Sequence, residues 1–275
     1  MKTRKTLNIA HRGARSLAPE NTLPAAQKAF EIGADLWELD VAMTSDGEIV
    51  VLHDDTLERT SNASQVFPER KPWKVETFTL HELRSLDFGS WFVRDDPFQQ
   101  IMLGSVPEAD QKKFYRLPIP TLEEALVFTR DRHWHVNVEI KDLTGKPGDQ
   151  TIVENVVSLI GSLNLEKSVI ISSFNHHYIQ RVKSANPGIT TAALVEDPSL
   201  DPLALLIGLE AQAYNPNWDT LDFDQVQTVI SHGFDVFVWT VNNVLAMRKL
   251  IDLDVSGIFT DFPQRLIKVL EIYPG

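Results

Sequence analysis

Short β-rich runs alternate with amphipathic helical stretches along most of this chain, and this alternation is the feature that most limits its fold. Strands that alternate with helices favour parallel pairing through right-handed crossover connections. A length of 275 residues is large for one average domain but suits a single α/β barrel. Nine runs have the composition of strands: Leu7–Ala10, Leu36–Val41, Ile49–Leu52, Val136–Ile140, Val169–Ser172, Thr190–Val195, Ala211–Tyr214, Val236–Val241 and Ile258–Thr260.

These strand candidates are one more than an eight-stranded barrel can use. We expect the surplus to be either Thr190–Val195 or Ala211–Tyr214. The link "AMTSDGE", which joins the second and third candidates, is too short to contain a helix. It is therefore either a helix-free connection or a β-hairpin.

Helix signals stand between the strand candidates. The amphipathic pattern predicts helices over Leu23–Ile32, Thr151–Leu163 and Leu221–His232. "TLHE" at 79–82 and "TLEE" at 121–124 match the capping box, in which Thr and Glu satisfy free backbone groups at a helix start. Each box predicts that a helix begins there.

Residues 61–118 interrupt the alternation. This segment contains polar and proline-marked stretches and an aromatic cluster at Phe88, Trp91 and Phe92. The sequence has no internal repeat, low-complexity tract or interdomain linker, so we predict one domain over residues 1–275. The segment 61–118 is then an insertion packed over one end of the barrel.

Composition narrows the range of partners. The net charge is −12 and no basic stripe is present, which argues against nucleic acid and against stable association with an anionic membrane. The absence of cysteine excludes disulfides, thiolate catalysis and cysteine zinc sites. The start "MKTRKTLNIAHRG" has no apolar region of signal-peptide length, and no stretch approaches the roughly 18 apolar residues of a spanning helix. We therefore expect a cytoplasmic protein, in an oligomeric state that the sequence does not indicate.

Charged residues occupy strand positions where apolar side chains are expected. Glu38 and Asp40 interrupt the apolar run "LWELDV", and Glu139 and Lys141 do the same in "VNVEIKD". Side chains at i and i+2 on a strand share a face, so the members of each pair point the same way. Functional residues of a parallel barrel gather at the C-terminal strand ends, and both pairs fall late in their runs. Three carboxylates make a hard-oxygen site suited to Mg²⁺ or Ca²⁺.

Two histidines end apolar runs, His11 in "LNIAH" and His53 in "IVVLH". Two imidazoles at neighbouring strand ends suit proton donation and removal near neutral pH. Arg12 and Lys141 can bind an anion beside the metal, Arg as a planar fork and Lys as a point charge. A metal, two bases and two cations together indicate phosphoryl transfer or phosphodiester cleavage.

The segment "IAHRGARSLAPENTLPAAQKAFEIGADLWELDVAMTSDGEIVVLHDDTLERTS" resembles the start of the glycerophosphodiester phosphodiesterase family, in its cytoplasmic bacterial form. The resemblance continues through "LRSLDFGSWF", "IPTLEEAL", "VEIK", "ISSF", "VWTVN" and "GIFTDFP", and it covers nearly the whole chain. It implies a TIM (β/α)8 barrel with a small inserted segment after the third strand. It also implies hydrolysis of glycerophosphodiesters, such as glycerophosphocholine and glycerophosphoethanolamine, to sn-glycerol 3-phosphate and an alcohol.

The resemblance also implies roles for particular residues. It makes His11 and His53 the acid–base pair. The ligands of one divalent cation, Mg²⁺ or Ca²⁺, are Glu38, Asp40 and Glu139. The phosphate is bound by Arg12 and Lys141. The sequence leaves open which histidine is the first base, and whether the nucleophile is the glycerol 2-hydroxyl or water.

Four further residues have two interpretations each. Glu20 of "PENT" resembles a family position near the metal and the first histidine, but a carboxylate at a helix start is also favoured by the helix dipole. Asp54 either orients His53 or a neighbouring cation, or it caps the following turn. Phe174 and Trp239 form an apolar wall for the glycerol carbons, or they are core aromatics.

Two alternative functions remain at this stage. A lysophospholipase D or phospholipase C-like enzyme on the same barrel would need a membrane-facing apolar rim, which Trp91 and Phe92 could form if they did not pack onto the barrel. A non-catalytic binding barrel is the second alternative. The two histidines argue against it, because a binding protein does not need two bases beside a metal.

Overall fold

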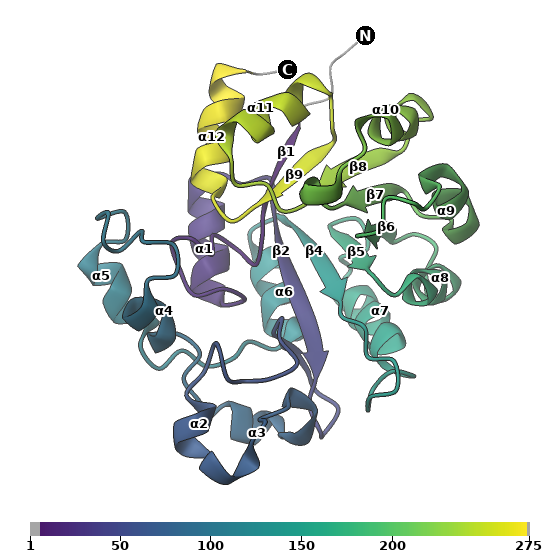
Figure 1. The fold of residues 1–275 in the computed structure, drawn as a ribbon. Helices are drawn as coiled ribbons and strands as arrows, with labels where there is room; N and C mark the ends of the chain where they lie inside the picture. Colours follow the sequence, from purple (N-terminus) through teal and green to yellow (C-terminus); the bar gives the residue numbers. More distant parts are fainter. Residues whose placement is uncertain (1–5, 274–275) are drawn as a thin grey trace.

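The computed structural model describes residues 6–273, and at its centre parallel strands close into an eight-stranded barrel (Figure 1). The first strand pairs with the second and with the last, so that Ala10 lies opposite both Trp37 and Thr260, and these two pairings close the sheet. The predicted TIM barrel is therefore confirmed. Its strands are β1 (Leu7–Ala10), β2 (Leu36–Met43), β4 (His135–Ile140), β5 (Val169–Ser173), β6 (Thr190–Val195), β7 (Ala213–Pro216), β8 (Asp235–Val238) and β9 (Gly257–Thr260).

One further strand, β3 (Ile49–Val51), lies outside the barrel. It runs antiparallel to the end of β2, with Val51 opposite Val41. The link "AMTSDGE" is thus a hairpin, in which Gly47 has a φ of 84° that a residue without a side chain adopts readily. Of the two interpretations of this link, the hairpin is confirmed.

The surplus strand candidate is Ile49–Leu52, so the expectation that placed the surplus at Thr190–Val195 or Ala211–Tyr214 is wrong. Both of those runs form barrel strands, β6 and β7. A parallel connection needs a crossover of about a dozen residues or more, whereas an antiparallel one needs only a tight turn. The short link after β2 therefore forces β3 to double back on β2.

Helices cover the outside of the barrel between successive strands (Figure 1). The predicted helices at 23–32, 151–163 and 221–232 are confirmed to within two residues at each end. The helices around the barrel are α1 (Leu23–Ile32), α6 (Leu122–Asp131), α7 (Ile152–Ser162), α8 (His176–Ala185), α9 (Pro202–Leu209), α10 (Phe223–Ser231), α11 (Val244–Asp252) and α12 (Pro263–Ile272). Within residues 6–273, no helix has both the length and the apolar character needed to cross a membrane.

The segment 61–118 follows β3, as the resemblance implies, and lies beside the barrel (Figure 1). Its helices are α2 (Ala63–Val66), α3 (Leu80–Leu83), α4 (Ser90–Asp95) and α5 (Glu108–Gln111). Both capping boxes are confirmed, since Thr79 opens α3 and Thr121 opens α6. Trp91 and Phe92 are 6% and 0% exposed and pack in one cluster with residues that precede and begin α1. These two aromatics therefore anchor the segment on the barrel and do not form an exposed rim.

Strand β2 shows how the fold places polar groups at the site. Trp37 and Leu39 point outward into the core between sheet and helices, while Leu36 points into the barrel interior. Glu38 and Asp40 occupy the next inward positions along the strand, because side chains alternate between the two faces. Along β2, the side chains that point into the barrel are thus apolar near the start of the strand and carboxylates toward its C-terminal end.

Candidate active site

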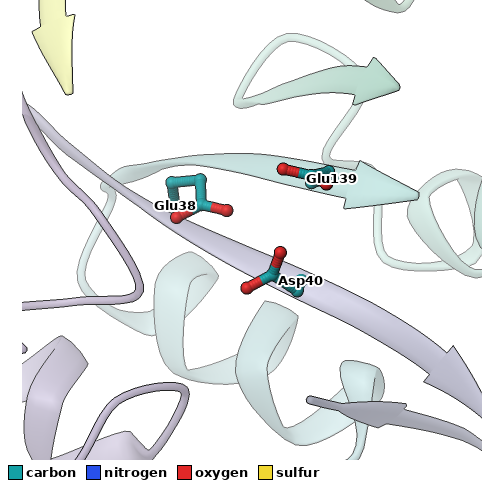
Figure 2. Close-up of side chains that lie close together, drawn as sticks. All are labelled: Glu38, Asp40 and Glu139. Carbon is teal, nitrogen blue, oxygen red and sulfur yellow. The ribbon is translucent and has the colours of Figure 1, made fainter. Parts of the chain in front are cut away.

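Three carboxylates meet at the C-terminal end of the barrel (Figure 2). Glu38 and Asp40 come from β2 and Glu139 from β4, and strand pairing places Asp40 opposite Glu139. One carboxylate oxygen of each residue lies within 4.8 Å of those of the other two. Glu38 and Asp40 are 2% and 1% exposed. The structure thus brings together the three predicted metal ligands.

The electrostatics of this cluster favour a bound cation. Burial raises the pKa of Glu38 well above its ordinary value, and the charges of Asp40 and Glu139 raise it further. Burial and the charge of Asp40 likewise raise the pKa of Glu139. Burial opposes ionisation of Asp40 too, but Arg12 and Lys141 outweigh it and lower the pKa of that carboxyl to about 2. A divalent cation would relieve the repulsion among the three groups.

Two buried oxygens show that the carboxylates fit such an ion. Oε1 of Glu38 and Oδ1 of Asp40 have no hydrogen-bond partner among residues 6–273. Unpartnered buried carboxylate oxygens are costly unless they coordinate a metal or hold a ligand. The donor set consists only of oxygens, which suits Mg²⁺ or Ca²⁺.

Arg12 and Lys141 flank the carboxylates. The backbone N–H of Arg12 donates to Oε2 of Glu38 at 2.7 Å, and its Nε lies 3.3 Å from Oδ2 of Asp40. Nζ of Lys141 lies 2.8 Å from Glu139 and 3.6 Å from Asp40. Both side chains border the same cavity as Glu38 and Glu139, so they can meet an anion that binds there.

The glycine of "HRG" is required by close packing. Gly13 has a φ of 80°, and a Cβ atom at this position would lie 2.7 Å from backbone and side-chain atoms of Ala25 in α1. No other residue fits here without a shift of backbone. Gly13 therefore lets the chain turn sharply after Arg12, so that Arg12 lies beside the cluster.

His11 follows β1 and is held by a partner from the far end of the chain. Its Nδ1 lies 2.7 Å from Oδ1 of Asp261, which follows β9. The pairing of β1 with β9 creates this contact. Burial lowers the pKa of His11, and the nearby charge of Arg12 lowers it further, although Asp261 opposes both effects.

His53 follows β3 and is held by its neighbour in the chain. Its Nδ1 lies 2.7 Å from Oδ1 of Asp54. Arg59 donates from Nε to Oδ2 of Asp54 at 2.7 Å. Burial opposes ionisation of Asp54, but His53 and Arg59 together hold its pKa well below its ordinary value. Asp54 thus contacts both His53 and a neighbouring cation, and in both histidines the contact with the carboxylate is made by Nδ1 rather than Nε2.

Glu20 joins the two histidine–carboxylate pairs through arginines. Its carboxylate accepts from Arg59 at 2.7 and 2.9 Å, from Arg15 at 2.7 Å and from Arg12 at 2.8 Å. Arg15 also lies 3.5 Å from Asp261. An unbroken series of charged contacts therefore runs from one pair to the other. Glu20 is buried and is not part of the carboxylate cluster, and the N-cap of α1 is Thr22 rather than Glu20.

Three of these charged residues were not singled out from the sequence. Asp261 ends the run "GIFTD", at a strand end where functional residues gather, and Arg59 stands six residues after His53 in the matching segment. Arg15 lies in the same segment as His11. Position at strand ends was thus the only signal for Asp261, while nothing in the sequence pattern pointed to the arginines.

Most of the predicted residues border a cavity of about 230 Å³, whereas Asp40, Glu20 and Asp54 are not among its lining residues. On one side, Phe174 and Trp239 meet edge to face, with ring centroids 5.4 Å apart. Nε1 of Trp239 donates to the backbone oxygen of Asn215 at 2.8 Å, which fixes the indole ring. Both aromatics therefore present apolar surface to the cavity that the charged groups also border. The residues that border the cavity include His11, Arg12, Glu38, His53, Glu139, Lys141, Phe174 and Trp239.

Comparison with known families identifies one match. Residues 11–265 match the family described as the Glycerophosphoryl diester phosphodiesterase family. A glycerophosphodiester phosphodiesterase of Caldanaerobacter subterraneus subsp. tengcongensis is 35% identical over 267 residues, which cover 97% of this chain and 98% of that protein. A glycerophosphodiester phosphodiesterase of Bacillus subtilis is 31% identical over 279 residues, covering 98% and 88%.

Solved structures show the same fold. A putative glycerophosphoryl diester phosphodiesterase of Silicibacter pomeroyi has a TM-score of 0.81 at 24% identity, over 98% of this chain and 94% of that one. A phosphodiesterase of Oleispira antarctica has a TM-score of 0.77 at 25% identity, over 96% of each chain. The second structure is a complex with the product sn-glycerol-3-phosphate.

Proposed function

The chain belongs to the glycerophosphoryl diester phosphodiesterase family, and from this premise we propose that it hydrolyses small glycerophosphodiesters such as glycerophosphocholine and glycerophosphoethanolamine. The products are sn-glycerol 3-phosphate, the ligand in the Oleispira structure, and a free alcohol. The observation that carries the proposal is the convergence of the carboxylate cluster and two histidine–carboxylate pairs at one cavity. This convergence also disfavours a non-catalytic binding barrel.

Glu38, Asp40 and Glu139 are the residues that would hold a divalent cation, Mg²⁺ or Ca²⁺. When bound, such an ion supplies Lewis acidity at a phosphoryl oxygen. Arg12 and Lys141 contribute positive charge beside the same position, where negative charge develops in the transition state. Ion pairs hold both cationic groups in place before the substrate arrives, so little reorganisation is needed.

His11 and His53 are the proton-transfer groups. One imidazole takes the proton of the attacking hydroxyl group, and the other gives a proton to the alkoxide that leaves phosphorus. Asp261 and Asp54 each hold Nδ1 of one ring, which fixes its orientation and directs Nε2 to the transfer. The same two groups serve whether the glycerol 2-hydroxyl attacks first to give a cyclic phosphate or water attacks directly.

A lipid-directed function is less well supported. The alternative of a lysophospholipase D or phospholipase C-like enzyme relied on Trp91 and Phe92 as an exposed rim, and both are buried. A cytoplasmic location and the lack of stable membrane association remain predictions.

The proposal is tested by measuring release of sn-glycerol 3-phosphate from glycerophosphocholine and glycerophosphoethanolamine. We expect release to stop after chelation and to return when Mg²⁺ or Ca²⁺ is added back. Lysolipid vesicles serve as the comparison substrate. Release from vesicles alone would favour the lipid-directed function, and no release from the small diesters under either ion would refute the proposal.

A further inference from the structure

Two buried polar side chains on the wall of the cavity take no part in the proposed mechanism. Asn137 of β4 and Ser172 of β5 both border the cavity, and they are 1% and 0% exposed. Strand pairing places Asn137 opposite Glu38 and Ser172 opposite Glu139. The two side chains therefore lie next to the carboxylate cluster, and Asn137 is one inward position deeper in the barrel than Glu139.

This pair has hydrogen-bonding capacity that the protein does not use. Nδ2 of Asn137 donates to Oγ of Ser172 at 2.8 Å. Oδ1 of Asn137 has no hydrogen-bond partner in the described part of the chain. Because Oγ of Ser172 accepts the bond from Asn137, its own proton is left to donate. Buried polar atoms are nearly always hydrogen-bonded, so an unpartnered atom on a cavity wall indicates a group that binds there.

The unused groups complement a hydroxyl group. They offer one acceptor and one donor side by side, and a hydroxyl is itself both a donor and an acceptor. If the nitrogen and oxygen of the amide were exchanged, Asn137 would present the donor and Ser172 the acceptor, with the same result. In either orientation an anionic group would face one acceptor oxygen, whose partial negative charge repels it, and an apolar group would leave both partners unsatisfied.

The remaining walls are suited to the carbon atoms of the same ligand. Phe174, Trp239 and Phe259 also border the cavity and present apolar surface. A ligand that has a hydroxyl group on a short carbon chain would satisfy both kinds of wall. A purely apolar or purely ionic ligand would leave one of them unmatched.

We propose that Asn137 and Ser172 bind a hydroxyl group of the glycerol unit and make the cavity selective for polyol phosphates. This inference rests on the proposed function, because it names the part of the substrate that the pair recognises. A site built to hydrogen-bond a substrate hydroxyl discriminates strongly against an analogue without it, since its buried polar groups are then left unpaired.

The test compares three ligands by calorimetry in the presence of Mg²⁺: sn-glycerol 3-phosphate, propane-1,2-diol 1-phosphate and propane-1,3-diol phosphate. The two diol phosphates each lack one hydroxyl group of the glycerol unit. We expect the unsubstituted protein to bind the glycerol compound at least about 30-fold more tightly than one of them. In Ser172→Ala and Asn137→Ala, we expect this ratio to fall to about threefold or less.

Asn215 provides a matched control. Its side chain on β7 is also fully buried with an unpartnered amide, but it is not among the residues that border the cavity. Asn215→Ala should therefore leave the ligand ratio unchanged. A ratio near one in the unsubstituted protein would overturn the inference, as would an equal fall of the ratio in Asn215→Ala. Circular dichroism checks that each variant folds.

Hydrolysis of glycerophosphocholine is measured in parallel, so that a result against one proposal can be distinguished from a result against the other. Hydrolysis together with a ligand ratio near one would refute this inference and leave the proposed function intact. Selective binding of the glycerol compound without hydrolysis under either ion would refute the proposed function alone.

Discussion

The two histidine–carboxylate pairs have the same contact distance but reach it by different routes. His11 and Asp261 stand 250 positions apart in the sequence and meet because β1 pairs with β9. His53 and Asp54 are neighbours in the sequence, just after a strand that lies outside the barrel. In both pairs Nδ1 lies 2.7 Å from a carboxylate oxygen. Closure of the barrel thus builds one pair, while local sequence builds the other.

The two imidazoles differ in how exposed they are and in which contacts support them. The His11 side chain is 16% exposed and follows a strand of the barrel. The His53 side chain is 31% exposed and follows a short hairpin strand. The His53 pair depends instead on Arg59, which connects Asp54 to the buried carboxylate of Glu20. The comparison teaches that ion pairs can supply on a loop the rigidity that a barrel strand provides by packing.

The largest expected effect comes from removing either imidazole. We expect His11→Gln and His53→Gln each to lower kcat for glycerophosphocholine by about 10²–10⁴-fold, because general acid–base catalysis contributes that much. The double variant should lose little more than the worse single one, since the two groups act in the same reaction. His232→Gln, an exposed histidine after α10, is the control and should retain full activity. A His53→Gln variant with more than a tenth of normal kcat would show that the two pairs are not equivalent.

We expect removal of the carboxylate partner to lower kcat to a different extent in the two pairs. We expect Asp261→Asn to lower kcat on the order of 10²-fold, because a buried amide at this position can donate to Nδ1 and stabilise the wrong tautomer. Asp54 is more exposed, so water can replace part of its contact with His53, and Asp54→Asn should cost about tenfold. Steady-state kinetics of both variants, with the fold checked by circular dichroism, makes the comparison. Equal losses would mean that burial does not distinguish the pairs.

Arg59→Met tests the ion-pair support of His53. We expect kcat to fall about fivefold and the ¹⁵N shifts of the His53 ring to change, while those of the His11 ring stay nearly constant. Arg59→Lys should recover only part of the activity, because an ammonium group cannot make the two-sided contacts of a guanidinium. Arg84→Met breaks a surface ion pair with Glu124 and serves as the control, with a stability change of about 1 kcal/mol or less. Changes of similar size at both rings would indicate a general loss of structure.

The smallest expected effect concerns stability and pH. Burial opposes ionisation of Glu20, but Arg59, Arg15 and Arg12 hold its pKa well below the ordinary 4.5. Its ionised form therefore stabilises the fold above pH 4.5, and this contribution declines as the pH falls toward the lowered pKa. Relative to Glu20→Gln, the unsubstituted protein should lose about 0.8 kcal/mol of unfolding free energy between pH 7 and pH 4. Urea unfolding of both proteins at the two pH values measures this difference, and a constant difference would contradict the lowered pKa.

The contrast between the pairs also explains what the sequence could predict. The barrel, its helices and the cluster of Glu38, Asp40 and Glu139 were predictable because each depends on local periodicity and on strand ends. The place of β3 outside the barrel was not predicted, since composition alone does not distinguish an antiparallel hairpin strand from a parallel barrel strand; the short link before it was the signal for the hairpin. The role of Asp261 was not predicted either, because only closure of the sheet brings it to His11. Asp54 was a candidate partner of His53 because the two are adjacent in the sequence, but the sequence left a turn-capping role equally open, and only the structure shows the contact.

The closure of the barrel has a consequence for synthesis of the protein. His11 leaves the ribosome early, but its partner Asp261 is translated some 250 residues later. A nascent chain that has not yet produced β9 can neither close the sheet nor orient this imidazole. If His11 and His53 have the proposed roles, the chain completes its acid–base pair only when translation is nearly finished, and we expect unfinished chains to have little phosphodiesterase activity.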